Sequence, residues 1–295
     1  MRSGTWLVVG LACALVGPAA AQGPAPAAGA PVQPTAPKAA KAPKGPKKGA
    51  KVVDVKVDVP ATVAMLWGGS NDAAAKAAET LATSSDPAAH EALLDALAIG
   101  MPPAVAVATI SALTAHPAPP DVAALVRYSV HHNPQVRSAA YGALALYPAP
   151  DAKAAIVAGL HDMNGSARDA AAMAAAKGRV REAIEPMFEL LARSDDGASK
   201  ALSTMADAEL ARRIGDQFGK VPEPILAQTL GAILKRPDFG PDPARVDLVR
   251  AIGKIQDASA VGVLTDYLDA TPKNPPRQSR QEAQKMVEAR LGGGK

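Results

Sequence analysis

The sequence predicts an all-α fold, a right-handed α-solenoid of antiparallel helix pairs preceded by a disordered tail. From residue 60 onward, apolar residues recur every three or four positions between turn-forming residues, which is typical of amphipathic helices. A repeat near 31 residues runs through these helices. Units of this length indicate a solenoid, in which each repeat buries its apolar face against its neighbours. The repeat is seen in four apolar pairs, spaced 32, 31 and 31 residues apart: Leu93-Leu94, Leu125-Val126, Ile156-Val157 and Met187-Phe188.

The first 21 residues have the pattern of a secretory signal peptide. A basic residue, Arg2, precedes an apolar run over residues 6–17 and a stretch of small residues that ends at Ala21. The run is shorter than the roughly 20 residues that a membrane-spanning helix needs, so we expect no stable transmembrane span after cleavage. Two alternatives stay open: lipidation at Cys13, and retention of the segment as an inner-membrane tether. Because Cys13 is the only cysteine, the mature chain should contain none.

Residues 22–59 are predicted to be a disordered linker rich in Pro, Ala and Lys. Such a composition cannot bury enough apolar surface to offset the entropy lost on ordering. The linker ends in a short extended segment, because residues 53–59 alternate between valine and charged residues with the period of a strand. The Lys-rich part of the linker before this segment is either a spacer or a contact to an anionic polymer of the envelope. The lysines that would make this contact are Lys38, Lys41, Lys44, Lys47, Lys48 and Lys51.

The basic charge of the whole chain belongs to this linker. The formal net charge is +4, yet residues 60–295 contain 24 basic and 26 acidic residues. A folded part with this balance offers no general electrostatic attraction to nucleic acid. We therefore expect no specific nucleic-acid binding.

Residues 60–291 are predicted to form the helical repeat domain. Asp86-Pro87, Asn133-Pro134 and Asp242-Pro243 each place a capping side chain before a proline at the first helical position. Residues 196–245 break the regular spacing, with one shortened unit and an inserted loop at 237–243, so we expect a change of curvature there. The helix boundaries are expected at 68–69, 86–87, 100–103, 117–120, 133–134, 148–150, 164–165, 178, 195–197, 222–224, 237–243 and 272–276.

Residues 134–140 read Pro-Gln-Val-Arg-Ser-Ala-Ala and resemble the start of the second helix of a HEAT repeat, of the short subtype also seen in phycobilisome-lyase-like proteins. Residues 165–171 and 247–253 are looser copies with the arginine in register. The resemblance covers roughly residues 70–270 and implies a solenoid, but says little about activity, because HEAT repeats occur in scaffolds, adaptors and a few enzymes. It also implies that one arginine per repeat contacts an acid in the neighbouring turn and sets the repeat register: Arg137, Arg168 and Arg250.

We expect no catalytic, cofactor-binding or metal-binding residue. The sequence lacks a Gly-x-Ser-x-Gly nucleophile motif and a phosphate-binding Gly-rich loop. Its histidines are not spaced as metal ligands usually are. His90-Glu91 is similar to the His-Glu pairs that hold two irons in HEAT-like hydroxylases, but those enzymes need four such pairs and this chain has one.

A candidate contact patch flanks the turn at Asn133-Pro134, because interfaces are enriched in Tyr and Arg. Its residues are Tyr128, His132, Arg137 and Tyr141. We therefore expect an exported scaffold or adaptor, periplasmic or at the cell surface, that binds an unidentified protein partner through a solenoid face without catalysis. Two alternatives are a lyase-like HEAT enzyme that acts on a bound group, and an envelope tether that contacts an anionic surface through the Lys-rich tail.

Overall fold

The computed structural model describes residues 57–292. The predicted signal peptide, Cys13, the six linker lysines and most of the predicted extended segment lie outside these residues.

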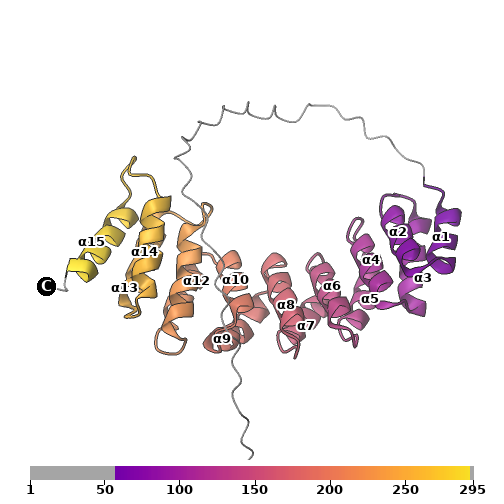
Figure 1. Cartoon of the computed structure of the whole chain (residues 1–295), viewed down its shortest axis with the longest axis horizontal. Helices are drawn as coiled ribbons and strands as arrows, with labels where there is room; N and C mark the ends of the chain where they lie inside the picture. The colour runs from indigo at the N-terminus through magenta and orange to yellow at the C-terminus, as the bar shows by residue number, and fades with distance from the viewer. Residues whose placement is uncertain (1–56, 293–295) are drawn as a thin grey trace, which may run out of the picture. The chain divides into compact units, whose positions relative to one another are not determined.

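The described residues form α-helices joined by short turns (Figure 1), so the predicted all-α solenoid is confirmed. A single 3₁₀ turn, η1 (Arg181–Ala183), precedes α9. The helices in chain order are α1 (Val59–Gly68), α2 (Asn71–Leu81), α3 (Pro87–Ile99), α4 (Pro103–Leu113), α5 (Asp121–Tyr128), α6 (Pro134–Leu144), α7 (Pro150–Gly159), α8 (Gly165–Lys177), α9 (Ile184–Ala192), α10 (Asp196–Met205), α11 (Ala208–Gly215), α12 (Glu223–Lys235), α13 (Asp242–Lys254), α14 (Ser259–Ala270) and α15 (Gln278–Gly292).

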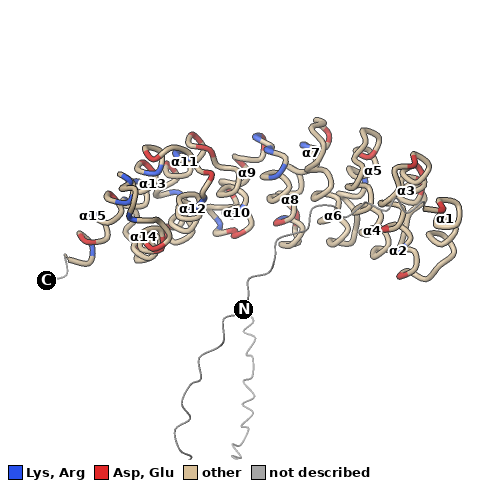
Figure 2. Tube along the Cα trace, turned by 90° about the horizontal axis from the view of Figure 1, so that it is seen from above, with Lys and Arg blue, Asp and Glu red and all other residues tan. Residues whose placement is uncertain are grey.

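The helices lie in two rows. The odd-numbered helices from α1 to α13 form one row and the even-numbered helices from α2 to α14 form the other, as Figure 2 shows, and α15 contacts both α13 and α14. Each odd helix and the even helix after it make one antiparallel pair. The helices α4, α6, α8 and α10 begin at Pro103, Pro134, Gly165 and Asp196, each 31 residues after the last, which explains the repeat in the sequence.

The two rows are packed differently. Neighbouring even helices contact each other closely, whereas neighbouring odd helices from α1 to α9 make few contacts. Alanine side chains cause the close packing of the even row, because they let two helix backbones approach each other. Ala140 and Ala143 of α6, for example, are buried, as are Ala171 and Ala175 of α8.

Two of the three predicted proline caps are confirmed. The carboxylate of Asp86 accepts a hydrogen bond from Ala88 N at 2.9 Å, and the amide oxygen of Asn133 accepts one from Gln135 N at 2.8 Å. The third is wrong, because Asp242 is the first residue of α13 rather than its cap. Its carboxylate instead accepts hydrogen bonds from the backbone N and hydroxyl of Ser279, at the start of α15.

The end of the predicted extended segment is also corrected. Val59 is the first residue of α1 and is buried, and the Asp58 side chain caps the helix by accepting from Ala61 N at 3.1 Å. A good cap followed by Pro60 outweighs the short alternating pattern. The regular spacing breaks where this was expected, because α12 begins 27 residues after α10 and α14 begins 36 residues after α12.

Two helical glycines should respond to alanine in opposite directions. A Cβ added at Gly159 would meet Ala171 Cβ and the Tyr141 ring at 2.7 Å, whereas one added at Gly142 would meet nothing within 4 Å. We expect Gly159→Ala to lower the free energy of unfolding by about 1–3 kcal/mol through overpacking. Gly142→Ala should raise it by up to about 1 kcal/mol. Urea denaturation followed by circular dichroism measures both, and a shift of the same sign at both positions would contradict the close approach of α7 and α8.

Candidate functional site

An open groove of about 1080 Å³ lies between α5 and α7 in the odd row. Proline side chains from the turns at 117–120 and 148 form one end of it, and the exposed Val130 lies at the other. Asp151 is the only charged residue in its lining, and most of the groove surface is apolar. Valines from α5 and its following turn face alanines of α7 across the groove: Val122, Val126 and Val130, and Ala154, Ala155 and Ala158.

The groove exists because the outer surface of α7 is made of small side chains. The large side chains of the two helices, Leu125 and Ile156, are buried in the core. Ala154 and Ala158 remain at the surface and are too short to fill the space toward α5. The same two alanines also line a second groove of about 530 Å³ on the other side of α7. An apolar, concave and solvent-open surface of this kind typically marks a binding site.

A buried polar cluster supports the proline end of the groove. Asp121, the first residue of α5, is fully buried. His90 Nε2 of α3 lies 2.7 Å from its Oδ1, and Tyr147 Oη, after α6, donates to its Oδ2 at 2.5 Å. The backbone N of Ala118 donates to the same Oδ2 at 2.9 Å. Burial and the hydrogen bond to Asp121 raise the pKa of Tyr147. The cluster therefore joins α3, the start of α5 and the turn after α6.

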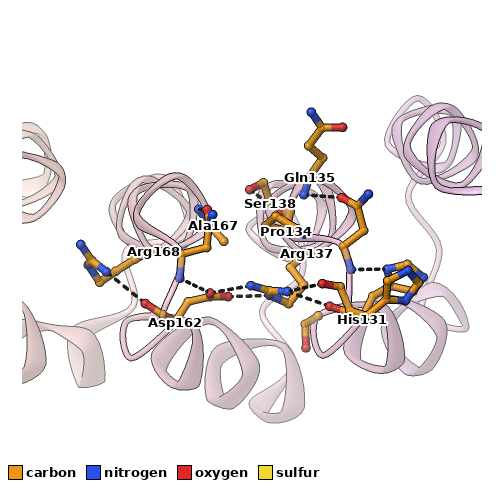
Figure 3. A network of polar contacts seen from close by, with 12 residues as sticks. His131, Pro134, Gln135, Arg137, Ser138, Asp162, Ala167 and Arg168 are labelled. Carbon is orange, nitrogen blue, oxygen red and sulfur yellow. Dashed lines mark hydrogen bonds and ion pairs between the residues drawn. The ribbon is translucent and has the colours of Figure 1, made fainter.

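A second polar network links the turns between odd and even helices (Figure 3). Arg137 donates through Nε and Nη2 to the two carboxylate oxygens of Asp162, each at 2.7 Å. Its Nη1 donates to the carbonyls of His131 and His132. One repeat further on, Arg168 donates to Asp195 at 2.9 Å and to the carbonyl of Asp162 at 3.0 Å. Each arginine thus joins its own turn to the next, which is the geometry expected of contacts that set register.

Arg250 lies in a different environment from the other two arginines. It is more than half exposed, and its Nε lies 3.2 Å from Glu282, which belongs to helix α15 rather than to a turn. Near it, Arg245 is buried and donates to the carbonyls of Leu234 and Phe239. The sequence motif therefore identifies Arg250 as the arginine of this repeat, but Arg245 is the arginine that makes buried contacts to backbone carbonyls here.

The predicted contact patch is corrected by the burial of its two tyrosines. Tyr128 Oη donates to Leu97 O at 2.9 Å, and Tyr141 Oη donates to Ser129 O at 3.0 Å. Arg137 is occupied by the network above, so of the four residues only His132 is exposed. These side chains hold neighbouring repeats together and do not form an exposed surface.

Neither the Asp121 cluster nor the groove was predicted from the sequence. A signal for the cluster was available, because His90 and Asp121 are separated by 31 residues, the length of one repeat. The groove leaves a weaker signal, the alanines at the outward positions of α7. Across residues 57–292, no group of three or more His, Cys, Asp or Glu could hold a metal ion. In the same part of the chain no helix is long and apolar enough to cross a membrane.

The Arg137–Asp162 pair predicts a loss of stability in acid. The hydrogen bond from Arg137 lowers the pKa of Asp162 below its ordinary value. A carboxyl group whose pKa is lower in the folded state stabilises the fold above its unfolded pKa, and this contribution is lost as the pH falls through the folded pKa. We expect the free energy of unfolding to fall below about pH 4 more steeply in the parent protein than in Asp162→Asn. Urea titrations at a series of pH values measure the difference, and identical slopes would contradict the prediction.

These features define the class of protein. The described residues form an α-solenoid of stacked helix pairs, with polar networks joining successive turns and an apolar groove on the odd row. Residues 90–176, which include the whole Asp121 cluster, part of the arginine network and the whole groove, match the family model of HEAT repeats. No curated protein matches the chain.

Several solved structures share features of the fold. One is the complex of CpcE and CpcF of phycocyanin lyase from Nostoc sp. PCC7120, with 16% identity and a TM-score of 0.44, covering 86% of this chain and 99% of that one. Another is Kap121p, with 13% identity and a TM-score of 0.42, covering 78% of this chain and 29% of that one. A third is an engineered protein with 20% identity and a TM-score of 0.34, covering 81% and 98%.

Proposed function

We propose that this chain is an exported scaffold or adaptor that binds a protein partner through the groove between α5 and α7. The observation that carries the proposal is the groove itself, a concave surface of about 1080 Å³ with a single charged lining residue, Asp151. HEAT repeats commonly mediate protein–protein contacts, and the match covers both helices that form the groove. The proposal assigns the protein binding and no catalytic step.

The dimensions of the groove suit a short amphipathic helix. Helices α5 and α7 have 8 and 10 residues, so the groove is roughly 12–15 Å long at a rise of about 1.5 Å per residue. This length takes two to three turns of a partner helix, which would place anchors at positions i, i+3 or i+4, and i+7. Because the groove offers few polar groups, the anchors should be apolar.

The test uses a photocrosslinking amino acid placed in the groove. The positions are Ala154 and Ala158, with the exposed Ala98 of α3 as the matched control outside it. We expect one identified protein to be captured from both groove positions and not from Ala98. The purified partner should then bind the parent chain in calorimetry and lose most of its affinity for Ala158→Glu. Equal capture at all three positions, or unchanged affinity of Ala158→Glu, would overturn the proposal.

Export is a separate part of the proposal, supported by the pattern of residues 1–21. N-terminal sequencing of the protein from fractionated cells tests it, with Gln22 expected as the first residue. A chain that begins at residue 1 would instead support the tether, and a lipidated Cys13 the lipoprotein. The Lys-rich linker would then supply reach, or a contact to an anionic polymer that weakens as salt is raised.

A further inference from the structure

Most of the large apolar side chains that are exposed lie along one edge of the solenoid. In residues 57–292, five of the eight sit at or beside a turn that leads from an odd helix to the following even helix. None lies in a turn that leads from an even helix to an odd one. We name the five the tip row, and their exposed fractions are Trp67 42%, Ile99 74%, Val130 80%, Met163 100% and Phe218 41%.

The tip row follows from the topology. Odd helices run parallel to one another, so their C-terminal ends, and the turns after them, all lie at the same edge. Trp67, Ile99, Val130 and Met163 come from four successive turns of this edge, one from each repeat. The arginine network holds these turns in place, since Arg137 binds both the turn that carries Val130 and the turn that carries Met163.

The charges along this edge are few. Turns 66–70, 98–102, 129–133 and 160–164 contain one carboxylate, Asp162, and Arg137 neutralises it. Asp72 and Asp95 lie on the helices α2 and α3. At these four turns the exposed end therefore offers an apolar side chain with no unpaired charge in the turn, whereas Phe218 lies between the exposed Asp216 and Lys220.

We propose that the tip row inserts into the interface of a lipid bilayer, so that the protein lies on a membrane along this edge. Trp67, Ile99, Met163 and Phe218 project singly and line none of the grooves described above. A protein partner would need a separate socket for each of them at one-repeat intervals. A bilayer interface needs no such match, because it receives apolar side chains wherever they project. Since no described helix can cross a membrane, the contact is peripheral.

This inference goes beyond the proposed function and uses other residues. The groove alanines lie on the odd row, and the tips lie at its edge, so a protein held on a bilayer by the tips would still expose Ala154 and Ala158 to a partner. Val130 belongs to both surfaces and is left unchanged in the test. The experiments can therefore show that one of the two proposals is wrong without deciding the other.

The test places an environment-sensitive nitrobenzoxadiazole dye at single positions of the full chain. Cys13, the only cysteine, is first replaced by Ser so that the dye reports one site. Ile99→Cys and Met163→Cys carry the dye on the tip row, and Thr83→Cys and Ser85→Cys carry it on the opposite edge, where both residues are also exposed. With phosphatidylcholine vesicles in high salt, we expect a blue shift and at least a doubling of emission at the two tip positions only. These conditions suppress attraction through the linker lysines, and a retained N-terminal segment would act on both edges alike.

A second measurement uses vesicle partitioning of unlabelled protein. Ile99→Ser with Met163→Ser should lower the partition coefficient about tenfold or more, whereas Met173→Ser with Leu291→Ser, two exposed residues away from the tips, should not change it. Equal emission at both edges, or equal partitioning of the two double variants, would overturn the proposal. Dye that responds to a purified protein partner but not to vesicles would overturn it as well, in favour of a protein contact.

Discussion

Replacing Asp121 by Ala should lower the free energy of unfolding by about 3–5 kcal/mol, because it removes the shared partner of three polar groups from a buried hydrogen-bonded cluster. Asp121 is fully buried, and its carboxylate is the shared acceptor for Tyr147 Oη and Ala118 N and the partner of His90 Nε2. Alanine would leave these groups without their partner, and a buried polar group left unpaired is costly. Urea denaturation measures the loss.

The effect should also be local. In a solenoid each repeat contacts only its neighbours, so hydrogen exchange should rise in α3, α5 and the turn after α6, and much less in α13 to α15. Tyr147→Phe removes one hydrogen bond and should cost about 1–2 kcal/mol. Asp151→Ala, the loss of an exposed acid on the next odd helix, should cost less than about 0.5 kcal/mol. If Asp121→Ala were no worse than Asp151→Ala, the cluster would contribute nothing to stability.

Arg137→Ala should cost about 2–3 kcal/mol, because one guanidinium joins two turns through a charge-assisted pair and two carbonyls. The side chains of Arg137 and Asp162 are both largely buried, so solvent screens the pair little. Arg137→Lys keeps the charge but not the planar fork, and it should restore less than half of the loss.

Arg250→Ala is the matched control for this variant. Arg250 occupies the same place in the sequence motif, but its contact with Glu282 is exposed on the Arg250 side, and such pairs contribute about 0–1 kcal/mol. We expect a loss below about 0.5 kcal/mol in urea denaturation. Equal losses for Arg137→Ala and Arg250→Ala would mean that the motif, rather than burial, decides the contribution of each arginine.

The repeat and its turns could be predicted from the sequence because they depend on local chemistry. Apolar spacing, prolines and capping residues mark helices that the structure contains, as at Asp86 and Asn133. Asp242 shows where local reasoning ends. Its side chain accepts a hydrogen bond from Ser279, which lies 37 residues further on, and therefore does not cap its own helix.

The candidate site was less predictable because it depends on burial. Tyrosine is common in interfaces, which is why Tyr128 and Tyr141 were predicted to form one. Whether a tyrosine faces solvent depends on where neighbouring carbonyls lie, and both hydroxyls donate to backbone carbonyls inside the repeat stack. The groove is defined by side chains that are too small to fill a space. No sequence motif marks an unfilled space between α5 and α7, so the groove is recognised only when the positions of the two helices are known.

The unequal packing of the two helix rows gives the solenoid a preferred direction of bending. The even row, with alanines in close contact, should resist both stretching and compression, while the odd helices from α1 to α9 have room to move apart or together. The solenoid should therefore bend with the even row as its hinge, and bending should change the width of the space between α5 and α7. A rigid partner bound between α5 and α7 would fix the local curvature. Because repeats lie on both sides of this site, it would also fix the angle between the repeats before it and the repeats after it.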